Sequence, residues 1–283
     1  MVTKGRAFCN GALTVLNAIG TGYGAAFGIG LKTIAEVEIG DVDEDISVEY
    51  DGPGHPELAV YTVKNVLQRF GIHRQVRVVT KSDIPISKGL KSSSSAANAI
   101  AIATLNAIGK SLSDYEIINL GIDAAVSAGV TVTGAYDDAV ACYFGNGYIT
   151  DNSNRKIIGN FATEERKAII LVPDESMEKK DFPVKRATKY SSILYTAMNE
   201  LYNGNIRNAI FINSLVYSFV AGYDITPVLK LYESGIPGGI TGTGPAVFAL
   251  VKDDNIDVAL DIFDSYSGNL IMTHVTEEKA GVL

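Results

Sequence analysis

Hydrophobic and polar residues follow strand-like and helix-like spacings through the first part of this 283-residue chain. Residues 31–39 and 75–80 alternate well enough to predict two strands, and residues 42–50 are a further extended candidate. Apolar residues recur at helical spacing from Pro56 to Phe70, which predicts a helix there. An Asp-Gly-Pro-Gly sequence at 51–54 separates this helix from the strand before it.

Two further helices are expected before the middle of the chain. An Ala-rich segment predicts a helix over 92–108, after a loop at 82–91. Another helix should begin at Ser113, because Ser113 and Glu116 have the spacing of a capping box. Residues 140–149 then predict a strand with a turn.

The second half of the chain shows a different order of elements. Residues 167–173 read as a buried strand. The expected elements after it are helices at 188–203, 205–221 and 225–234, a strand at 246–251, a helix at 255–265 and a strand at 270–276. This order indicates an α+β protein whose second half is a split βαβ arrangement. A polar stretch near residue 155 suggests two domains, 1–155 and 156–283.

Composition excludes several classes of protein. The net charge is −8, so a non-specific nucleic-acid binder is disfavoured, because such proteins need a dense basic surface. The two cysteines, Cys9 and Cys142, allow no disulfide framework, and the three histidines lack zinc-ligand spacing. The longest apolar run, residues 96–108, is too short to cross a bilayer, and no signal-peptide layout begins the chain. We expect a soluble cytoplasmic protein with no membrane or nucleic-acid partner.

The most informative segment is the loop that leads into the Ala-rich helix. A helix start has unpaired N–H groups and a partial positive charge, and small residues let a polyphosphate approach closely. Hydroxyls, one glycine and two lysines here exceed what capping needs, although a Ser-rich cap alone stays possible. The expected nucleotide-binding residues are Pro85, Ile86, Ser87, Lys88, Gly89, Leu90, Lys91, Ser92, Ser93, Ser94 and Ser95.

No other classical nucleotide motif is present. Neither the Walker A loop nor the G-x-G-x-x-G fingerprint occurs. Two more glycine-rich runs, at 20–24 and 238–245, are either turns or parts of a site.

Asp137 and Asp138 are the only acidic residues between Gly129 and Tyr148. A kinase that phosphorylates a hydroxyl uses a carboxylate to accept or orient the hydroxyl proton, and either aspartate suits that role. The alternative for this segment alone is an Asx turn or a helix cap. Because adjacent acids tend to point in different directions, we expect only one of them in a site.

These motifs together resemble the GHMP kinase superfamily. Residues 85–97 are similar to its P-x-x-x-G-L-x-S-S-A nucleotide motif, residues 134–140 to the stretch with its catalytic aspartate, and residues 239–251 to its C-terminal glycine-rich motif. The resemblance implies an N-terminal ribosomal protein S5 domain 2-like domain and a C-terminal ferredoxin-like domain. It also implies ATP as co-substrate.

Within the superfamily, three details resemble the archaeal-type shikimate kinases: G-L-K-S-S-S at 89–94, T-V-T-G-A-Y-D-D-A at 131–139 and A-I-G-T-G-Y-G-A-A at 18–26. This resemblance implies phosphorylation of the 3-hydroxyl of shikimate, with Asp137 as the catalytic aspartate. It also implies that Ser93 contacts Mg²⁺. We expect Lys91 to act as a second catalytic residue that stabilises charge on the transferred group.

The chain departs from the superfamily pattern at two places. Many members have a lysine near Ala12 that assists the aspartate, and many have a glutamate ligand of Mg²⁺ where this chain has Val126, with Asp123 as the nearest acid. Lys91 is a candidate replacement for the missing lysine. For the substrate carboxylate, Lys4, Arg6 and Lys32 are candidate partners, and nothing in the sequence selects among them. Homoserine kinase, mevalonate kinase and a non-catalytic sensor on the same fold stay open as alternatives.

Overall fold

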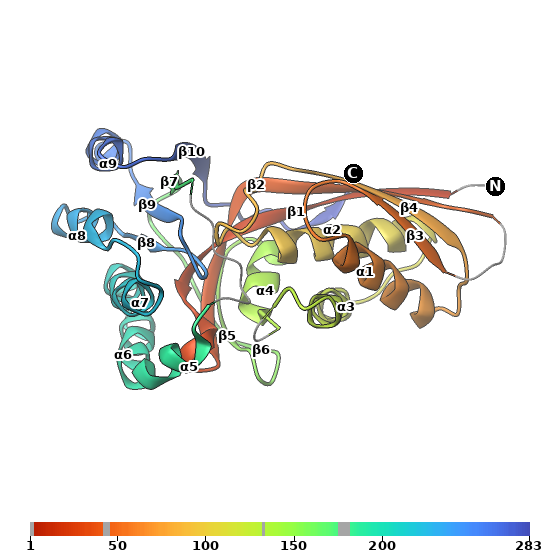
Figure 1. Ribbon diagram of the computed structural model, residues 1–283, viewed down its shortest axis with the longest axis horizontal. Helices are drawn as coiled ribbons and strands as arrows, with labels where there is room; N and C mark the ends of the chain where they lie inside the picture. The colour runs from red at the N-terminus through yellow and green to blue at the C-terminus, as the bar shows by residue number, and fades with distance from the viewer. Residues whose placement is uncertain (1–2, 42–45, 132–133, 175–181) are drawn as a thin grey trace.

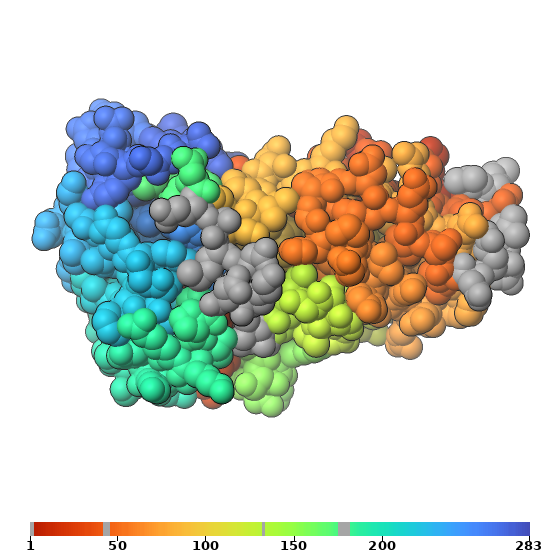
Figure 2. Space-filling view, viewed as in Figure 1, coloured from red at the N-terminus to blue at the C-terminus, as the bar shows by residue number. Residues whose placement is uncertain are grey.

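The computed structural model describes residues 3–41, 46–131, 134–174 and 182–283. It contains two β-sheets that lie at opposite ends of an elongated molecule, each with its own helices (Figure 1). In the space-filling view, the first half of the chain (orange and yellow) gathers on one side and the second half (green to blue) on the other (Figure 2). Among the described residues, no helix is long and apolar enough to cross a membrane.

The first sheet has seven strands built around two long ones. Its strands are β1 (Thr3–Leu16), β2 (Tyr23–Ile39), β3 (Ser47–Asp51), β4 (Gln75–Ser82), β5 (Gly147–Asp151), β6 (Lys156–Phe161) and β11 (Gly281–Val282). Along the main path the order is β11-β1-β2-β4-β3. Strand β5 pairs with residues 23–27 at the start of β2, and on its other side with β6. Only the β3–β4 pair is parallel.

Four helices cover one face of this sheet (Figure 1). They are α1 (Pro56–Arg69), α2 (Ser92–Ala107), α3 (Asp114–Ser127) and α4 (Tyr136–Phe144). The central helix α2 packs directly on β1, and a Cβ at Gly5 would lie 2.1 Å from the carbonyl oxygen of Ala103. Glycine is therefore required at this position, because any side chain would push the helix off the sheet.

The second sheet has the order β10-β7-β9-β8 and is antiparallel throughout. Its strands are β7 (Lys167–Val172), β8 (Gly238–Ile240), β9 (Val247–Val251) and β10 (Asn269–His274). The helices of this half are α5 (Val184–Ala187), α6 (Ser191–Tyr202), α7 (Ile206–Ala221), α8 (Thr226–Glu233) and α9 (Ile256–Asp264). The sheet order and the βαββαβ succession confirm the ferredoxin-like split βαβ arrangement.

Most predicted elements are present, and one was wrong. The expected strand at 140–149 is instead the end of α4, which continues to Phe144, followed by a turn and β5. Helix α4 begins after Ala135, which is in a left-handed conformation and has no side-chain cap, so its start lacks a capping residue although Asp137 and Asp138 are acidic residues of its first turn. Part of the extended candidate at 42–50 lies outside the described residues; its remainder forms β3.

Strands β1 and β6 have no counterpart among the elements expected from the sequence pattern. Nearly all of β1 is buried on both faces, so its residues do not alternate between apolar and polar. One hydrophobic core joins the ends of β1 and β2 to the second sheet, with Leu13, Phe27 and Phe248 among its members. The division into domains near residue 155 remains a prediction; β6 and β11, which follow that point, pair within the first sheet.

Candidate active site

The loop before α2 lies against the glycine-rich run of the second half. Gly89 has a φ of +85°, and a Cβ there would lie 2.0 Å from the carbonyl oxygen of Thr241. The Thr241 hydroxyl donates a hydrogen bond of 3.0 Å to the Gly89 carbonyl. Glycine at position 89 therefore allows two motifs that are about 150 residues apart in the sequence to touch.

The first turn of helix α2 contains four serines, of which one is fully buried. Lys91 is its N-cap in the left-handed conformation, with a φ of +67°. Ser92, Ser93 and Ser94 are half-buried in the first turn. Ser95 is fully buried, and its hydroxyl donates to the Cys9 carbonyl at 2.9 Å. The side chain of Ser95 thus fixes α2 on β1, whereas the three preceding serines line open space at the positive end of the helix.

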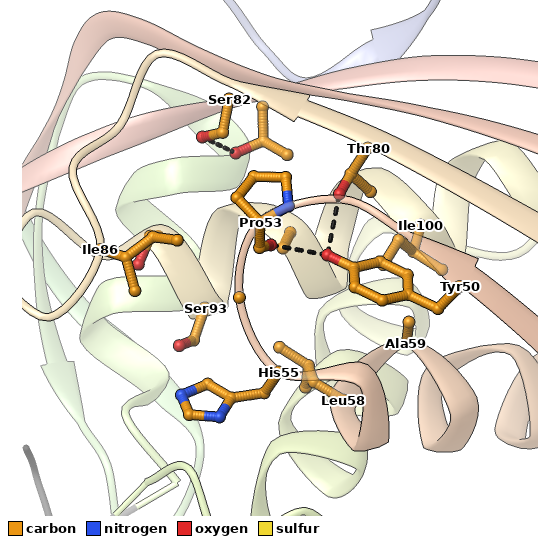
Figure 3. Close-up of a pocket in the computed structure, with 14 residues that line it drawn as sticks. Tyr50, Pro53, His55, Leu58, Ala59, Thr80, Ser82, Ile86, Ser93 and Ile100 are labelled. Carbon is orange, nitrogen blue, oxygen red and sulfur yellow. Dashed lines mark hydrogen bonds between the residues drawn. The ribbon is translucent and has the colours of Figure 1, made fainter.

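A hollow opens beside this helix start, between the β3–α1 loop and β4 (Figure 3). Tyr50, His55 and Ile86 give it apolar and aromatic walls, and Ser92 and Ser93 line its end at the helix. The Tyr50 hydroxyl lies 2.9 Å from the Thr80 hydroxyl, which fixes the ring. We name this space the first hollow.

Two more hollows continue from the first and share lining residues with it. Ser93 also lines a second hollow between α2, α3 and the start of α4. Thr131 and Ala135 line both the second hollow and a third one, which is also lined by Asp137. The three hollows are therefore neighbours that follow one another from the aromatic wall, past the start of α2, to the aspartate pair.

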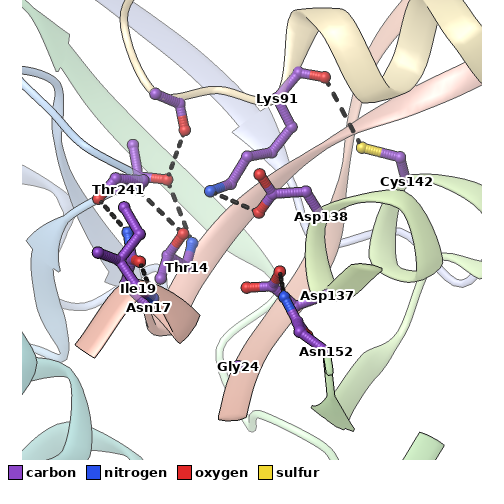
Figure 4. Close-up of polar contacts among 12 residues, drawn as sticks. Thr14, Asn17, Ile19, Gly24, Lys91, Asp137, Asp138, Cys142, Asn152 and Thr241 are labelled. Carbon is purple, nitrogen blue, oxygen red and sulfur yellow. Dashed lines mark hydrogen bonds and ion pairs between the residues drawn. The ribbon is translucent and has the colours of Figure 1, made fainter. Parts of the chain in front are cut away.

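Both lysines of the loop are engaged in contacts. The Lys91 ammonium lies 2.7 Å from Asp138 Oδ1, and the two side chains are only 3% and 7% exposed. Figure 4 shows this ion pair, and a Cβ at Gly242 would approach the Lys91 Nζ to 3.1 Å. Lys88 instead donates to the carbonyls of Pro173 and Asp174, at 2.6 and 2.9 Å. Lys91 thus lies in the third hollow, while the Lys88 ammonium contacts the chain after β7.

Asp137 and Asp138 point in different directions, as expected for adjacent residues on a helix. Asp137 accepts a hydrogen bond of 2.7 Å at Oδ1 from the Asn152 amide. Its carboxyl lies on the backbone of Gly24, where a Cβ would be 2.4 Å from Oδ2. Both aspartates belong to the first turn of α4 and are 5% exposed.

Burial, together with the neighbouring charge of Asp138, raises the pKa of Asp137 to about 6 against the opposing effects of Lys91 and Asn152. Desolvation disfavours the charged form of a carboxyl, whereas the cation and the amide donor favour it. The resulting pKa is near neutrality, which is the range in which a carboxyl accepts protons efficiently as a general base.

Opposite the aspartates, the turn after β1 forms the other wall of the third hollow, with Asn17, Ala18 and Ile19 (Figure 4). The Asn17 side chain accepts from the Ile19 N–H at 3.0 Å and donates to the Gly242 carbonyl at 2.8 Å. These contacts join the two halves of the chain at the hollow. The glycine-rich run at 20–24 contributes Gly24, and the run at 238–245 contributes Gly242 and Thr243.

The candidate cations for a substrate carboxylate lie elsewhere. Lys4, Arg6 and Lys32 each form an ion pair with a glutamate at the surface of the first sheet, and none lines the third hollow. Asp123, the acid nearest the expected metal-ligand position, pairs with Arg155 at 2.7 Å. Within the described ranges, no group of three or more His, Cys, Asp or Glu side chains could hold a metal ion.

Two residues of the site were missed in the sequence. Asn152 follows β5 in a polar turn, and Asn17 follows β1; neither belongs to a recognisable motif. No local signal distinguishes them from ordinary turn residues, because their partners are far away in the sequence. Val132 and Thr133, in the motif at 131–139, lie outside the described residues.

Comparisons with known proteins identify the family to which the chain belongs. A family model described as the GHMP kinases N terminal domain matches residues 57–146. The shikimate kinase of Methanothermobacter thermautotrophicus is 34% identical over 100% of this chain and 99% of its own. That of Methanosarcina mazei is 38% identical over 99% of this chain and 97% of its own.

Solved structures show the same fold at low sequence identity. Homoserine kinase from Cytophaga hutchinsonii superposes with a TM-score of 0.79 at 14% identity, covering 99% of this chain and 98% of that one. The mevalonate kinase of Methanococcus jannaschii gives 0.72 at 14% identity, covering 98% of each chain. The chain belongs to the GHMP kinases, and within them to the family of its shikimate kinase relatives. It is accordingly an ATP-dependent small-molecule kinase.

Proposed function

We propose that the chain is a shikimate kinase, which transfers the γ-phosphoryl group of ATP to the 3-hydroxyl of shikimate and releases ADP and shikimate 3-phosphate. The observation that carries the proposal is the row of three neighbouring hollows from the aromatic wall to Asp137. Such a row suits a nucleoside, its phosphates and an acceptor in succession. The shikimate kinase relatives, matched over their whole length, support shikimate as that acceptor. We place the reaction in the cytoplasm, where ATP is available.

In this proposal the nucleoside occupies the first hollow and the phosphates lie at the start of α2. The N–H groups of Ser92 to Ser95 face the phosphate oxygens, and the helix dipole favours their negative charge. The half-buried serine hydroxyls add donors. The expected contacts of residues 85–91 with the nucleotide are part of the same proposal, with the Lys88 ammonium engaged by backbone carbonyls as described.

Asp137 is the proposed general base. The shikimate 3-oxygen attacks the γ-phosphorus, the bond from that phosphorus to the β,γ-bridging oxygen breaks, and the hydroxyl proton moves to the Asp137 carboxylate. Lys91 contributes positive charge near the transferred oxygens. Because phosphoryl transfer depends on positioning and electrostatic stabilisation, a buried cation beside the base is well placed for this reaction.

The residues present also fit Mg²⁺. This ion prefers oxygen ligands and normally takes only one or two from the protein, the rest being phosphate and water. In the second hollow, the buried Thr131 hydroxyl has no hydrogen-bond partner, and Ser93 lies on the same wall. We propose that the Ser93 hydroxyl holds the ion. When bound, Mg²⁺ would neutralise charge on the β- and γ-phosphates.

A coupled ADP-release assay with shikimate, homoserine and mevalonate as acceptors tests the proposal. We expect ADP release with shikimate and little with the other two. Asp137→Asn should reduce turnover with shikimate by about 10²–10⁴-fold while ATP binding is retained. Preference for another acceptor, absence of acceptor-dependent ADP release, or near-wild-type turnover of Asp137→Asn would each contradict it.

A further inference from the structure

Behind Asp137, on the side away from the third hollow, two uncharged side chains form a short chain of hydrogen bonds with its carboxyl. The Asn152 amide donates to Asp137 Oδ1 at 2.7 Å, and the Thr150 hydroxyl lies 2.7 Å from the Asn152 Oδ1. Asn152 and Asp137 are 5% exposed and Thr150 is fully buried. Neither Asn152 nor Thr150 lines the third hollow, so neither is placed to touch a substrate there.

The fold fixes both of these side chains through the backbone. Thr150 pairs with Gly24 between β5 and β2, and its hydroxyl lies 3.3 Å from the Gly24 carbonyl. The Asn152 backbone N–H donates to the Gly22 carbonyl at 2.9 Å. The pairing of β5 with β2 thus positions Thr150 and Asn152 next to the carboxyl of Asp137, which belongs to α4.

The orientation of the Asn152 amide determines whether its N–H group or its oxygen faces Asp137. An asparagine side chain has one accepting end and one donating end. Because an ionised carboxylate only accepts hydrogen bonds, the donating end of Asn152 is turned toward Asp137, and its accepting end faces the Thr150 hydroxyl. The opposite orientation would bring the amide oxygen of Asn152 against the carboxylate oxygen of Asp137.

The carboxyl of Asp137 is limited on its other side by Gly24. A Cβ at Gly24 would lie 2.4 Å from Oδ2, so the carboxyl lies directly on the backbone of β2. With Oδ1 bound to Asn152 and the group packed on Gly24, rotation of the carboxyl is restricted (Figure 4). A base that is held in one orientation reacts faster than one that rotates freely.

We propose that Asn152 is a positioning residue that holds the Asp137 carboxylate in the orientation needed for proton acceptance, and that Thr150 holds the accepting end of the Asn152 amide in place. This inference rests on the proposed role of Asp137 as the base. It assigns to two residues outside the motifs a function in the reaction, although neither touches the reacting atoms.

The charged and titratable groups that face Asp137 set the expected pH behaviour. They are Asp138 on α4, Lys91 before α2 and Tyr217 on α7; Gly24 on β2 and Asn152 after β5 do not titrate. The amide of Asn152 favours the charged form of Asp137 and so lowers its pKa. Loss of this hydrogen bond should therefore raise the pKa and move the acid limb of the pH–turnover curve to higher pH.

The experiment compares Asn152→Ala, Thr150→Val and Thr150→Ser with the wild type, measuring kcat and both KM values across pH. We expect Asn152→Ala to reduce kcat about 10- to 100-fold, to shift the acid limb upward and to leave the KM for ATP within twofold. Thr150→Val should shift the limb in the same direction by less, and Thr150→Ser, which keeps the hydroxyl, should return it toward the wild-type position.

Asn154→Ala is the matched control, because the exposed Asn154 lies in the same turn and its amide also donates to an aspartate, the half-buried Asp151, at 2.8 Å. Its pH profile should coincide with that of the wild type. If the acid limb of Asn152→Ala coincides with it as well, or if Asn154→Ala shifts the limb equally, the inference is wrong.

A second measurement separates this inference from the proposed function. Carboxyl ¹³C NMR of the ligand-free protein follows the titration of Asp137 without any turnover, and Thr150→Val serves if Asn152→Ala does not fold. An upward shift of the Asp137 titration relative to the wild type supports the hydrogen-bond chain even if no acceptor is phosphorylated. An unchanged titration refutes it even if the wild type is an active shikimate kinase.

Discussion

The buried ion pair between Lys91 and Asp138 makes a quantitative prediction about stability. Its two charged atoms are 2.7 Å apart, and both side chains are almost completely removed from solvent. Lys91→Met keeps the length and apolar stem of the side chain but leaves the Asp138 charge buried beside Asp137. Removal of one partner from a buried pair costs about 3–5 kcal/mol, because the remaining charge is no longer compensated.

This cost can be measured by urea unfolding. With an m-value of about 3 kcal/mol/M, a loss of this size lowers the midpoint by roughly 1–1.7 M. The matched control is Arg166→Met, which breaks the 2.7 Å pair of Arg166 with Glu277, whose side chains are 59% and 60% exposed. An exposed pair contributes about 0–1 kcal/mol, so the control should unfold at nearly the wild-type midpoint.

The double variant Lys91→Met/Asp138→Asn tests whether the uncompensated charge of Asp138 causes the loss of stability. If the uncompensated charge is responsible, neutralising Asp138 should recover at least half of the lost stability. Equal midpoints for Lys91→Met and Arg166→Met, or a double variant less stable than Lys91→Met alone, would refute this reasoning. In either case the turnover of Lys91→Met measures the proposed contribution of the cation to catalysis.

Three further predictions concern Asp137. Turnover should rise with pH through about 6, because the base must lose its proton; a flat profile between pH 5 and 8 would contradict this. Since the folded-state pKa is raised above 3.8, the stability from this group is present below about pH 4 and is lost as pH rises through about 6. Asp137→Asn should therefore unfold at higher urea than the wild type at pH 8, with the difference shrinking toward pH 4. Gly24→Ala should reduce kcat at least 10-fold by displacing the carboxyl, whereas Gly40→Ala, whose Cβ would meet nothing closer than 3.5 Å, should not.

Elements were predicted correctly where their signal lies within a short segment, and were missed where no such local signal exists. Helix α3 was correctly predicted because its capping box is local, and the structure contains both hydrogen bonds between Ser113 and Glu116. The last five residues of α4, 140–144, were expected to belong to a strand, since they include β-branched and aromatic residues and the helix begins at a left-handed Ala135. Strand β1 was not predicted because burial on both faces removes the alternation on which strand prediction depends.

The same rule applies to the candidate site. The motifs identified the start of α2 and the aspartate pair, but the partner of Lys91 is Asp138, whereas the sequence analysis had linked Lys91 with Asp137. Asn152 reaches Asp137 only after β5 pairs with β2, so its role depends on a tertiary arrangement that no short segment encodes.

The pairing of β11 with β1 has a consequence for how the protein folds. Residues 281–282 pair with Ala7 and Phe8 of a strand that starts at residue 3, so this part of the border of the first sheet is completed by contacts that span almost the entire sequence. Contacts of such separation are slow to form, because a large loop must close first. Until then, the backbone of β1 at Ala7 and Phe8 lacks these partners and could pair with another chain, so refolding at high protein concentration should favour aggregation over recovery.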